Sequence, residues 1–377
     1  MAESGAGAHH VRRGGTTWGA SLLFCLAMAS LISPTLHSQP SRIPTLTDCI
    51  SARGRPWEPR VPVLRGHSGG LRQGGGGERS TGGGTLQLRG GDATFGFAQD
   101  LAAQVERTIR AVATMHDPHA GQAQRREAYE VCEIAKRDDE GCFLISQRLL
   151  DPSLPDPVRH FAFQLRAHLV EQRWEALPPT AKASLRQEAL FALANGTRPL
   201  MAEARFVKEK VVQVVVGIAR REWPEEWTDL LPALRELSQM GDTQGELALL
   251  LIRALPEDFI NSPSISVRRR QVLLASLTAA LPDLLDLTSS LLVGAMRRPG
   301  AWGGGTESAA VVDAALAAVE ALAAQASLQT LAKHLPLAEL LPLLRSQPAG
   351  PTRGGTDPRV RLIEVVGALA GKKDKVG

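Results

Sequence analysis

The side chains that could catalyse a reaction or hold a metal ion do not form known functional patterns in this sequence. Four cysteines show neither a C-x-x-C spacing nor a neighbouring histidine pair, which disfavours a zinc site or a disulfide framework. His160 and His168 are two helical turns apart, without an evident third ligand. The glycine runs lack the G-K-[ST] ending of a phosphate-binding loop, and no H-E-x-x-H or G-x-S-x-G motif occurs. We therefore expect no enzyme, no cofactor and no metal site.

Clustered arginines are the remaining candidates for chemistry, because a guanidinium group can bind phosphate. Arg268, Arg269 and Arg270 are consecutive and could contact the phosphates of an RNA, or could form a solvated helix end. The chain has 43 Lys and Arg against 39 Asp and Glu. Residues 1–96 hold ten of the basic residues and five of the acidic ones, so residues 97–377 hold 33 basic and 34 acidic residues. Because the charges of residues 97–377 nearly cancel, this part of the chain is not expected to bind nucleic acid by itself. We therefore favour the interpretation of the three arginines as a solvated helix end.

Residues 1–96 differ in composition from the rest of the chain. They contain 19 of the 36 glycines and few apolar residues, so burial cannot offset the entropy of ordering and we expect a disordered arm. Within it, Arg12 and Arg13 precede an apolar run over residues 17–32. This layout is typical of a secretory or organelle targeting signal, and the run is short for a membrane span.

From residue 97 onward the apolar residues recur at a helical period. Leu101, Val105, Ile109 and Val112 form one such stripe. The segment 204–221 is apolar nearly all round, which indicates a helix buried between neighbours. Helices are expected, with Pro- or Gly-marked turns between them, over residues 98–115, 120–137, 142–150, 158–174, 179–195, 204–221, 224–241, 244–255, 266–296, 308–326, 337–344 and 358–370.

The spacing of these helices predicts the architecture. Helices of 12–20 residues paired every 35–50 residues fit the period of HEAT or armadillo repeats. We predict an all-α fold in which residues 97–377 form a HEAT-repeat α-solenoid, a right-handed superhelical stack of antiparallel helix pairs. A compact bundle is the alternative, disfavoured because no strong heptad pattern accompanies about a dozen helices.

Two turns in this stretch carry specific expectations. Asn195-Gly196 ends a helix, and we expect Gly196 to adopt the left-handed conformation of a C-cap. Pro224 is expected at the first position of a new helix, with Glu225 and Glu226 favoured in its first turn by the helix dipole.

The segment 194–259 carries a fingerprint, and its residues are Arg221, Glu222, Trp223, Pro224 and Trp227. Trp223 and Trp227 are four residues apart, a spacing that suits two core anchors, so we interpret the motif as packing rather than direct partner contact. With Ala194 to Thr197 and Lys208 to Val212, the segment resembles the exportin-5-like members of the importin-β (karyopherin) superfamily. The resemblance covers residues 98–290 most strongly.

The resemblance implies a function. Exportins of this kind bind Ran in its GTP form through their N-terminal repeats, which are the part retained here. They carry structured RNA such as pre-microRNA, or protein cargo, past the nucleoporins of the nuclear pore. The resemblance thus implies a chain of the nucleus and cytoplasm whose helical body contacts no membrane. The alternative is a HEAT-type scaffold for protein–protein interaction, directed to an organelle or the secretory route by residues 17–32. Because no polar capping repeat closes the sequence, we also expect its last helices to expose apolar surface.

Overall fold

The computed structural model describes residues 92–301 and 305–346, together with residues 360, 363, 364 and 367. Residues 1–91 of the predicted arm, with its apolar run at residues 17–32, and most of the helix expected over residues 358–370 lie outside the described residues. The last five residues of the predicted arm, 92–96, are described and are helical, so the expectation of disorder is wrong for them. The described residues form helices and turns without any strand. In chain order the elements are α2 (Asp92–His116), α3 (Gln122–Ile134), α4 (Asp139–Leu149), α5 (Asp156–His168), a π-helical turn (Leu169–Arg173), a 3₁₀ turn (Trp174–Ala176), α6 (Pro179–Asn195), α7 (Arg205–Glu222), α8 (Leu230–Ser238), α9 (Asp242–Asn261), α10 (Val267–Met296), α11 (Glu307–Ala323), α12 (Leu328–His334) and α13 (Leu337–Ser346).

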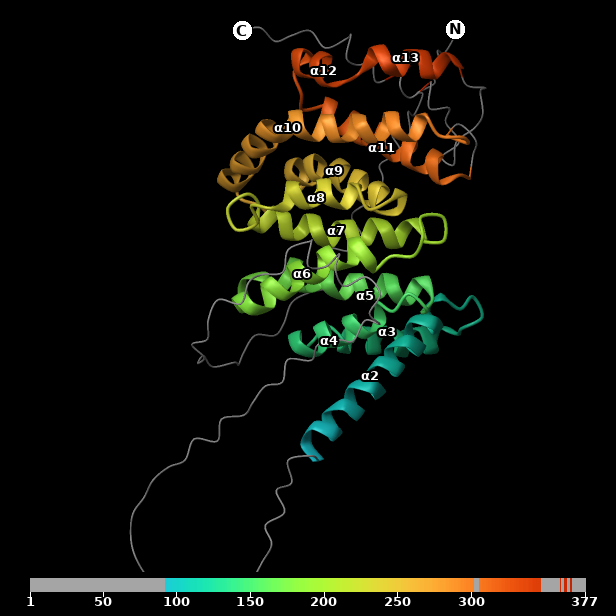
Figure 1. Ribbon diagram of the computed structural model, residues 1–377. Coiled ribbons are helices and arrows are strands. Elements are labelled where there is room, and N and C mark those ends of the chain that lie inside the picture. The colour runs from blue at the N-terminus through green and yellow to red at the C-terminus, as the bar shows by residue number, and fades with distance from the viewer. Residues whose placement is uncertain (1–91, 302–304, 347–359, 361–362, 365–366, 368–377) are drawn as a thin grey trace, which may run out of the picture. The chain divides into compact units, whose positions relative to one another are not determined.

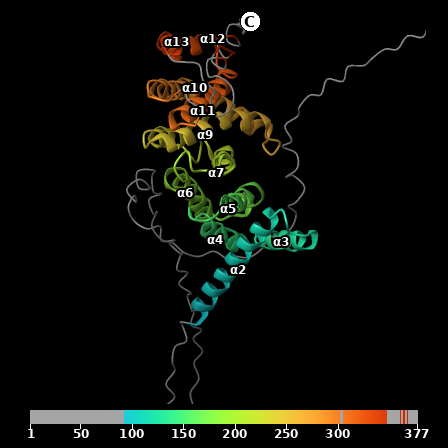
Figure 2. The same ribbon diagram turned by 90° about the vertical axis from the view of Figure 1, so that its right-hand side faces the viewer.

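The helices stack in chain order as pairs (Figure 1). Helix α4 packs on α5, α6 on α7, α8 on α9 and α10 on α11. The second helices of these pairs also pack on one another, so that α5, α7, α9 and α11 form a continuous row. In the view turned by 90° the helices again follow one another along the stack, from α2 to α13 (Figure 2). The prediction of an all-α stack of repeats is confirmed for the described residues.

Helix α7 shows why the stack holds together. Its valines are buried on every side, among them Val207, Val211 and Val215 at 0% exposed, because α5, α6 and α9 all pack on it. A helix in the middle of a repeat array has neighbours before and after it, and only such a position can accept an apolar circumference. The sequence prediction for residues 204–221 is therefore confirmed.

The Pro224 turn differs from the prediction. Residues 223–226 form a turn with a cis Trp223–Pro224 peptide bond, and α8 begins only at Leu230. The amides of Glu226 and Trp227 both donate to the Glu222 carbonyl (2.8 and 3.1 Å), which closes the turn on the end of α7. The expected helix start at Pro224 is therefore wrong. The turn is favoured over the expected helix because it places both Trp223 and Trp227 in the core.

Gly196 also differs from its prediction. Its backbone lies in the right-handed helical region (φ −90°, ψ −1°), not in the left-handed one. Glycine is needed there for space, since a Cβ atom would lie 2.8 Å from the Cα atom of Ala192.

Several helix boundaries also differ from the bounds expected from the sequence. The first helix begins at Asp92 rather than near residue 98, and α12 was not expected. Helix α10 continues through Pro282 and changes direction along its length (Figure 1). Within the described residues α10 alone has the length and composition of a membrane-spanning helix; half of its most apolar window is buried in the protein.

Candidate partner-binding surface

Ion pairs join each repeat to the next. The guanidinium group of Arg159 on α5 donates to both carboxylate oxygens of Glu203 (2.5 and 2.7 Å) and to the Gly196 carbonyl (2.8 Å). Both side chains of this pair are 0% exposed. Lys208 on α7 pairs with Glu246 on α9, in the next repeat, whereas Arg186 and Glu222 (2.5 Å) join the two helices of the α6–α7 pair. Buried pairs of this kind are weak sources of stability, but each holds its two groups in one geometry.

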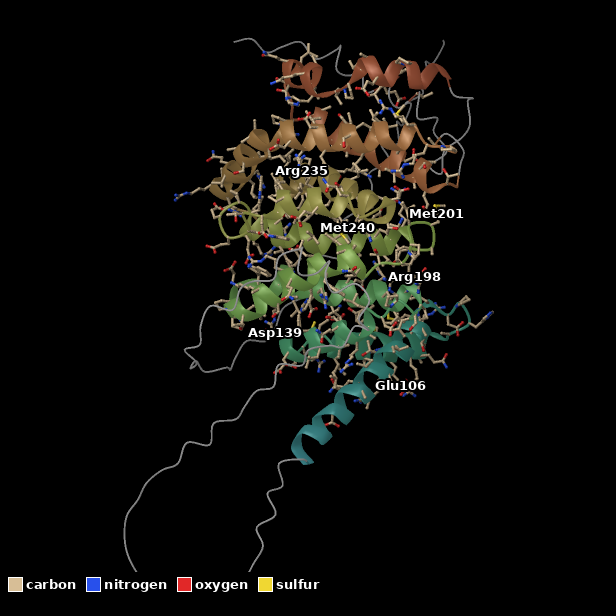
Figure 3. The ribbon with its side chains drawn as sticks, viewed as in Figure 1. Glu106, Asp139, Arg198, Met201, Arg235 and Met240 are labelled. Carbon is tan, nitrogen blue, oxygen red and sulfur yellow. The ribbon has the colours of Figure 1, made fainter. Side chains whose placement is uncertain are left out.

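Ion pairs also lie at both edges of the stack. Arg198, in the connection before α7, pairs with Asp156 (2.5 Å) and donates to the carbonyls of Pro152 (2.8 Å) and Leu154 (2.6 Å). Asp139 accepts from Arg173 (2.9 Å), and Figure 3 shows Asp139 and Arg198 at opposite edges of the stack. The Arg198 contacts thus join neighbouring repeats at one edge, whereas the Arg173–Asp139 pair closes the α4–α5 repeat on itself at the other.

A three-repeat junction lies at the end of α7. Arg220 pairs with Glu171, which the π-helical turn after α5 presents, and with Asp258 on α9 (3.1 Å). It also donates to the Ser262 hydroxyl (2.7 Å). Burial raises the pKa of Asp258, while Arg220 opposes that rise. Sequence reasoning missed this junction because its members are 38 to 49 residues apart.

The fingerprint residues lie beside this junction. Trp223 and Trp227 are 4% and 1% exposed, and the Trp223 ring stacks on Phe259 with centroids 5.9 Å apart. Arg221 donates to the carbonyls of Gly217 (2.9 Å) and Glu171 (3.3 Å). Glu222 accepts from Arg186 on α6, and Pro224 is half-buried in the turn. Both tryptophans are thus buried in the core beside the junction, and the interpretation of the motif as packing rather than partner contact stays a prediction.

The three consecutive arginines have different surroundings. Arg269 donates to the carbonyls of Arg220 (3.0 Å) and Trp223, and it pairs with Glu225, whose carboxyl pKa this hydrogen bond lowers. Arg270 donates to the Ser262 carbonyl (2.7 Å), and Arg268 is exposed. Arg269 thus ties the start of α10 to the fingerprint turn, and Arg270 ties it to the end of α9. Phosphate contact by the cluster stays a prediction.

The remaining cysteines and histidines have no site geometry in the described part of the chain. Cys132 and Cys142 are buried and reduced, and burial raises the pKa of Cys132 to about 11. Burial also raises the pKa of Cys142. His160 and His168 lie on α5, where burial lowers the pKa of both, that of His160 to about 4. Among the described residues no group of three or more His, Cys, Asp or Glu side chains could hold a metal ion.

One exposed surface was not anticipated from the sequence. We call it the α5–α7 face; it consists of His160, Gln164, Phe206, Lys210 and Gln213. The rings of His160 and Phe206 meet edge to face with centroids 5.3 Å apart, and Phe206 remains 45% exposed. Nearby, at the junction of α2 and α3, an open hollow of about 440 Å³ is lined by Met115, Gln122, Arg125, Arg126 and Tyr129. The large exposed apolar side chains Phe206 and Met115 make this end of the stack a candidate for contact with another protein.

Comparison with protein families matches residues 204–349 to the family described as Exportin 1-like protein. The match continues past residue 290, where the sequence resemblance was expected to fade. Among curated proteins, the chain is 33% identical over 190 residues to exportin-5 of Homo sapiens and 31% identical over 199 residues to exportin-5 of Dictyostelium discoideum. It is 30% identical over 199 residues to Protein HASTY 1 of Arabidopsis thaliana.

These matches involve about half of the chain, 50% for the human protein and 52% for the plant protein. They cover only 16% of the length of either relative. The likeness therefore indicates which kind of repeat array is present here. It concerns only a small part of each relative.

Proposed function

Since the helical body is exportin-5-like and carries an exportin 1-like region, we propose that this chain acts in nuclear export by binding Ran in its GTP form through its helical repeats. Similarity to exportin-5 proteins from an animal and an amoeba, at 33% and 31% identity, carries the proposal. Proteins of this kind are transport receptors and not enzymes, and any GTP hydrolysis would belong to Ran. The chain itself would supply a surface and no reacting group.

The fold agrees with such a role. A stack of helix pairs offers an extended surface, and the ion pairs between repeats keep that surface in one register. Side chains such as Phe206 and Met115 are exposed on it. Preorganised surfaces bind with a smaller loss of conformational entropy than flexible ones.

The test is a nucleotide-dependent binding measurement with the full chain. Ran loaded with a non-hydrolysable GTP analogue and Ran loaded with GDP would be passed over the immobilised chain at equal concentrations. We expect retention of the GTP form to exceed that of the GDP form by about tenfold or more, a difference of about 1.4 kcal/mol in binding free energy. Equal retention of the two forms, by a chain whose helical circular dichroism is intact, would remove the proposal.

Cargo and location form the second half of the proposal. We propose that structured RNA or protein is the cargo, that nucleoporins are contacted during transit, and that the chain moves between nucleus and cytoplasm. A gel-shift titration with a hairpin RNA, with and without GTP-form Ran, tests the RNA part: binding that strengthens with Ran supports it, and binding indifferent to Ran opposes it. The organelle alternative depends on residues 17–32, outside the described residues, and gains no support from the exportin likeness.

A further inference from the structure

The α5–α7 face brings an aromatic ring and an ammonium group together at the surface. Phe206 and Lys210 are one turn apart on α7, and His160 and Gln164 are one turn apart on α5, the helix that packs beside it. The edge-to-face contact between His160 and Phe206 fixes how the two helices present this face. We propose that the face binds a protein segment in which a carboxylate side chain adjoins an apolar one.

Lys210 supplies the first argument. Its ammonium group donates to the side-chain oxygen of Gln213 (2.8 Å), a neutral acceptor, and it forms no salt bridge with any carboxylate of the described residues. Lys208, two residues earlier on the same helix, is fully buried and paired with Glu246. A half-buried ammonium group without a carboxylate partner gains more from an incoming carboxylate than an already paired one does.

The charges around Lys210 point the same way. Lys136 acts electrostatically on Lys210, but its own ammonium group is already paired with Glu133 (2.6 Å). Glu171 is the nearby acid, and its carboxylate is already engaged by Arg220 and therefore compensated. Lys210 is therefore the ammonium group of this face that no salt bridge to a described carboxylate compensates.

Phe206 supplies the second argument, and it favours a protein segment over an RNA as the ligand of this face. It is 45% exposed, whereas Phe161, Phe163 and Phe259 are all buried. An exposed ring beside a charge suits a mixed apolar and acidic protein segment, because aromatic anchors in a polar rim carry much of the energy of protein contacts. An RNA backbone would need several cations in a row, and here Glu209, paired with Arg205 (2.8 Å), is exposed on the same helix.

The test uses the full chain and a labelled acidic peptide of sequence EEDLEEFD, followed by fluorescence anisotropy. We expect saturable binding that weakens about tenfold in Lys210→Gln and in Phe206→Ser, while Lys210→Arg retains it. The matched control is Lys333→Gln, an exposed lysine at the end of α12, which should change the affinity less than about twofold because it lies in another repeat. The uncharged peptide QQNLQQFN should bind about tenfold more weakly than the acidic one.

Three results would overturn the inference: no saturable binding of the acidic peptide, equal affinity for the wild-type chain and Lys210→Gln, or stronger Lys210-dependent binding of a poly-uridine oligonucleotide. Circular dichroism of each variant separates lost contact from lost folding. The measurement contains no Ran, so its failure leaves the nuclear export proposal standing, and equal binding of the two Ran forms leaves this inference standing.

Discussion

The Arg159–Glu203 pair offers the sharpest test of how the repeats are joined. In Glu203→Gln the guanidinium group of Arg159 stays buried but loses its counter-charge, with one amide oxygen left where two carboxylate oxygens accepted at 2.5 and 2.7 Å. Both side chains are 0% exposed, so water cannot take over the lost interaction. Breaking a buried pair in this way costs about 3–5 kcal/mol. The backbone amide of Arg198 also donates to Glu203 (2.8 Å), so the substitution also weakens a hydrogen bond within the α6–α7 connection.

The measurement is urea unfolding of the full chain, followed by far-ultraviolet circular dichroism and tryptophan fluorescence. We expect the two probes to shift together to lower urea in Glu203→Gln. The double variant Arg159→Met with Glu203→Leu should recover part of the loss, because two apolar side chains need no counter-charge, whereas the Gly196 carbonyl and the Arg198 amide lose their side-chain partners. A matched control is Glu209→Gln, which removes an exposed pair worth about 0.3–0.5 kcal/mol.

The reasoning fails if Glu203→Gln costs less than about 1 kcal/mol, since that would mean the pair is open to water or readily replaced. It also fails if the double variant is less stable than the single one. Either result would indicate that packing of α5 against the connection before α7, and not the charge pair, sets the register of these repeats.

Three further predictions concern single residues. Trp227→Ala should lower the free energy of unfolding by about 3–5 kcal/mol, because the ring is 1% exposed and leaves a cavity; a change under about 1 kcal/mol in urea unfolding would contradict its role as a core anchor. Gly196→Ala should cost about 1–3 kcal/mol, since a Cβ atom meets Ala192 at 2.8 Å, while Gly294→Ala on α10 should be neutral or stabilising because its Cβ position has no neighbour within 4 Å. His160 is held neutral, with its pKa lowered to about 4 from an ordinary 6.5, so the unfolded chain binds the extra proton and stability should fall as pH drops from about 6.5 to 4. His160→Gln should flatten that part of the pH profile in thermal unfolding, and an unchanged profile would contradict this assignment.

The repeat array follows from local sequence signals. The period of the apolar residues and the all-round apolar character of 204–221 depend on residues close together in the chain, and both appear in the structure as helices. Composition likewise set residues 1–96 apart from the body. The same local signals failed where a distant contact competes with them. The Trp223–Trp227 turn is shaped by burial against Phe259, so helix propensity after Pro224 did not decide its conformation.

Tertiary structure alone decided which charges meet. The junction of Arg220 with Glu171 and Asp258 joins residues 38 and 49 positions apart, and no pattern in the sequence distinguishes those acids from exposed ones. The same holds for the three arginines at residues 268–270, which look alike in sequence although two of them bind backbone carbonyls and one is exposed. Lys208 and Lys210 make the point on a single helix. Stacking buries one lysine against Glu246 and leaves the other at the surface beside Phe206, because two residues along a helix turn a side chain by more than half a circle.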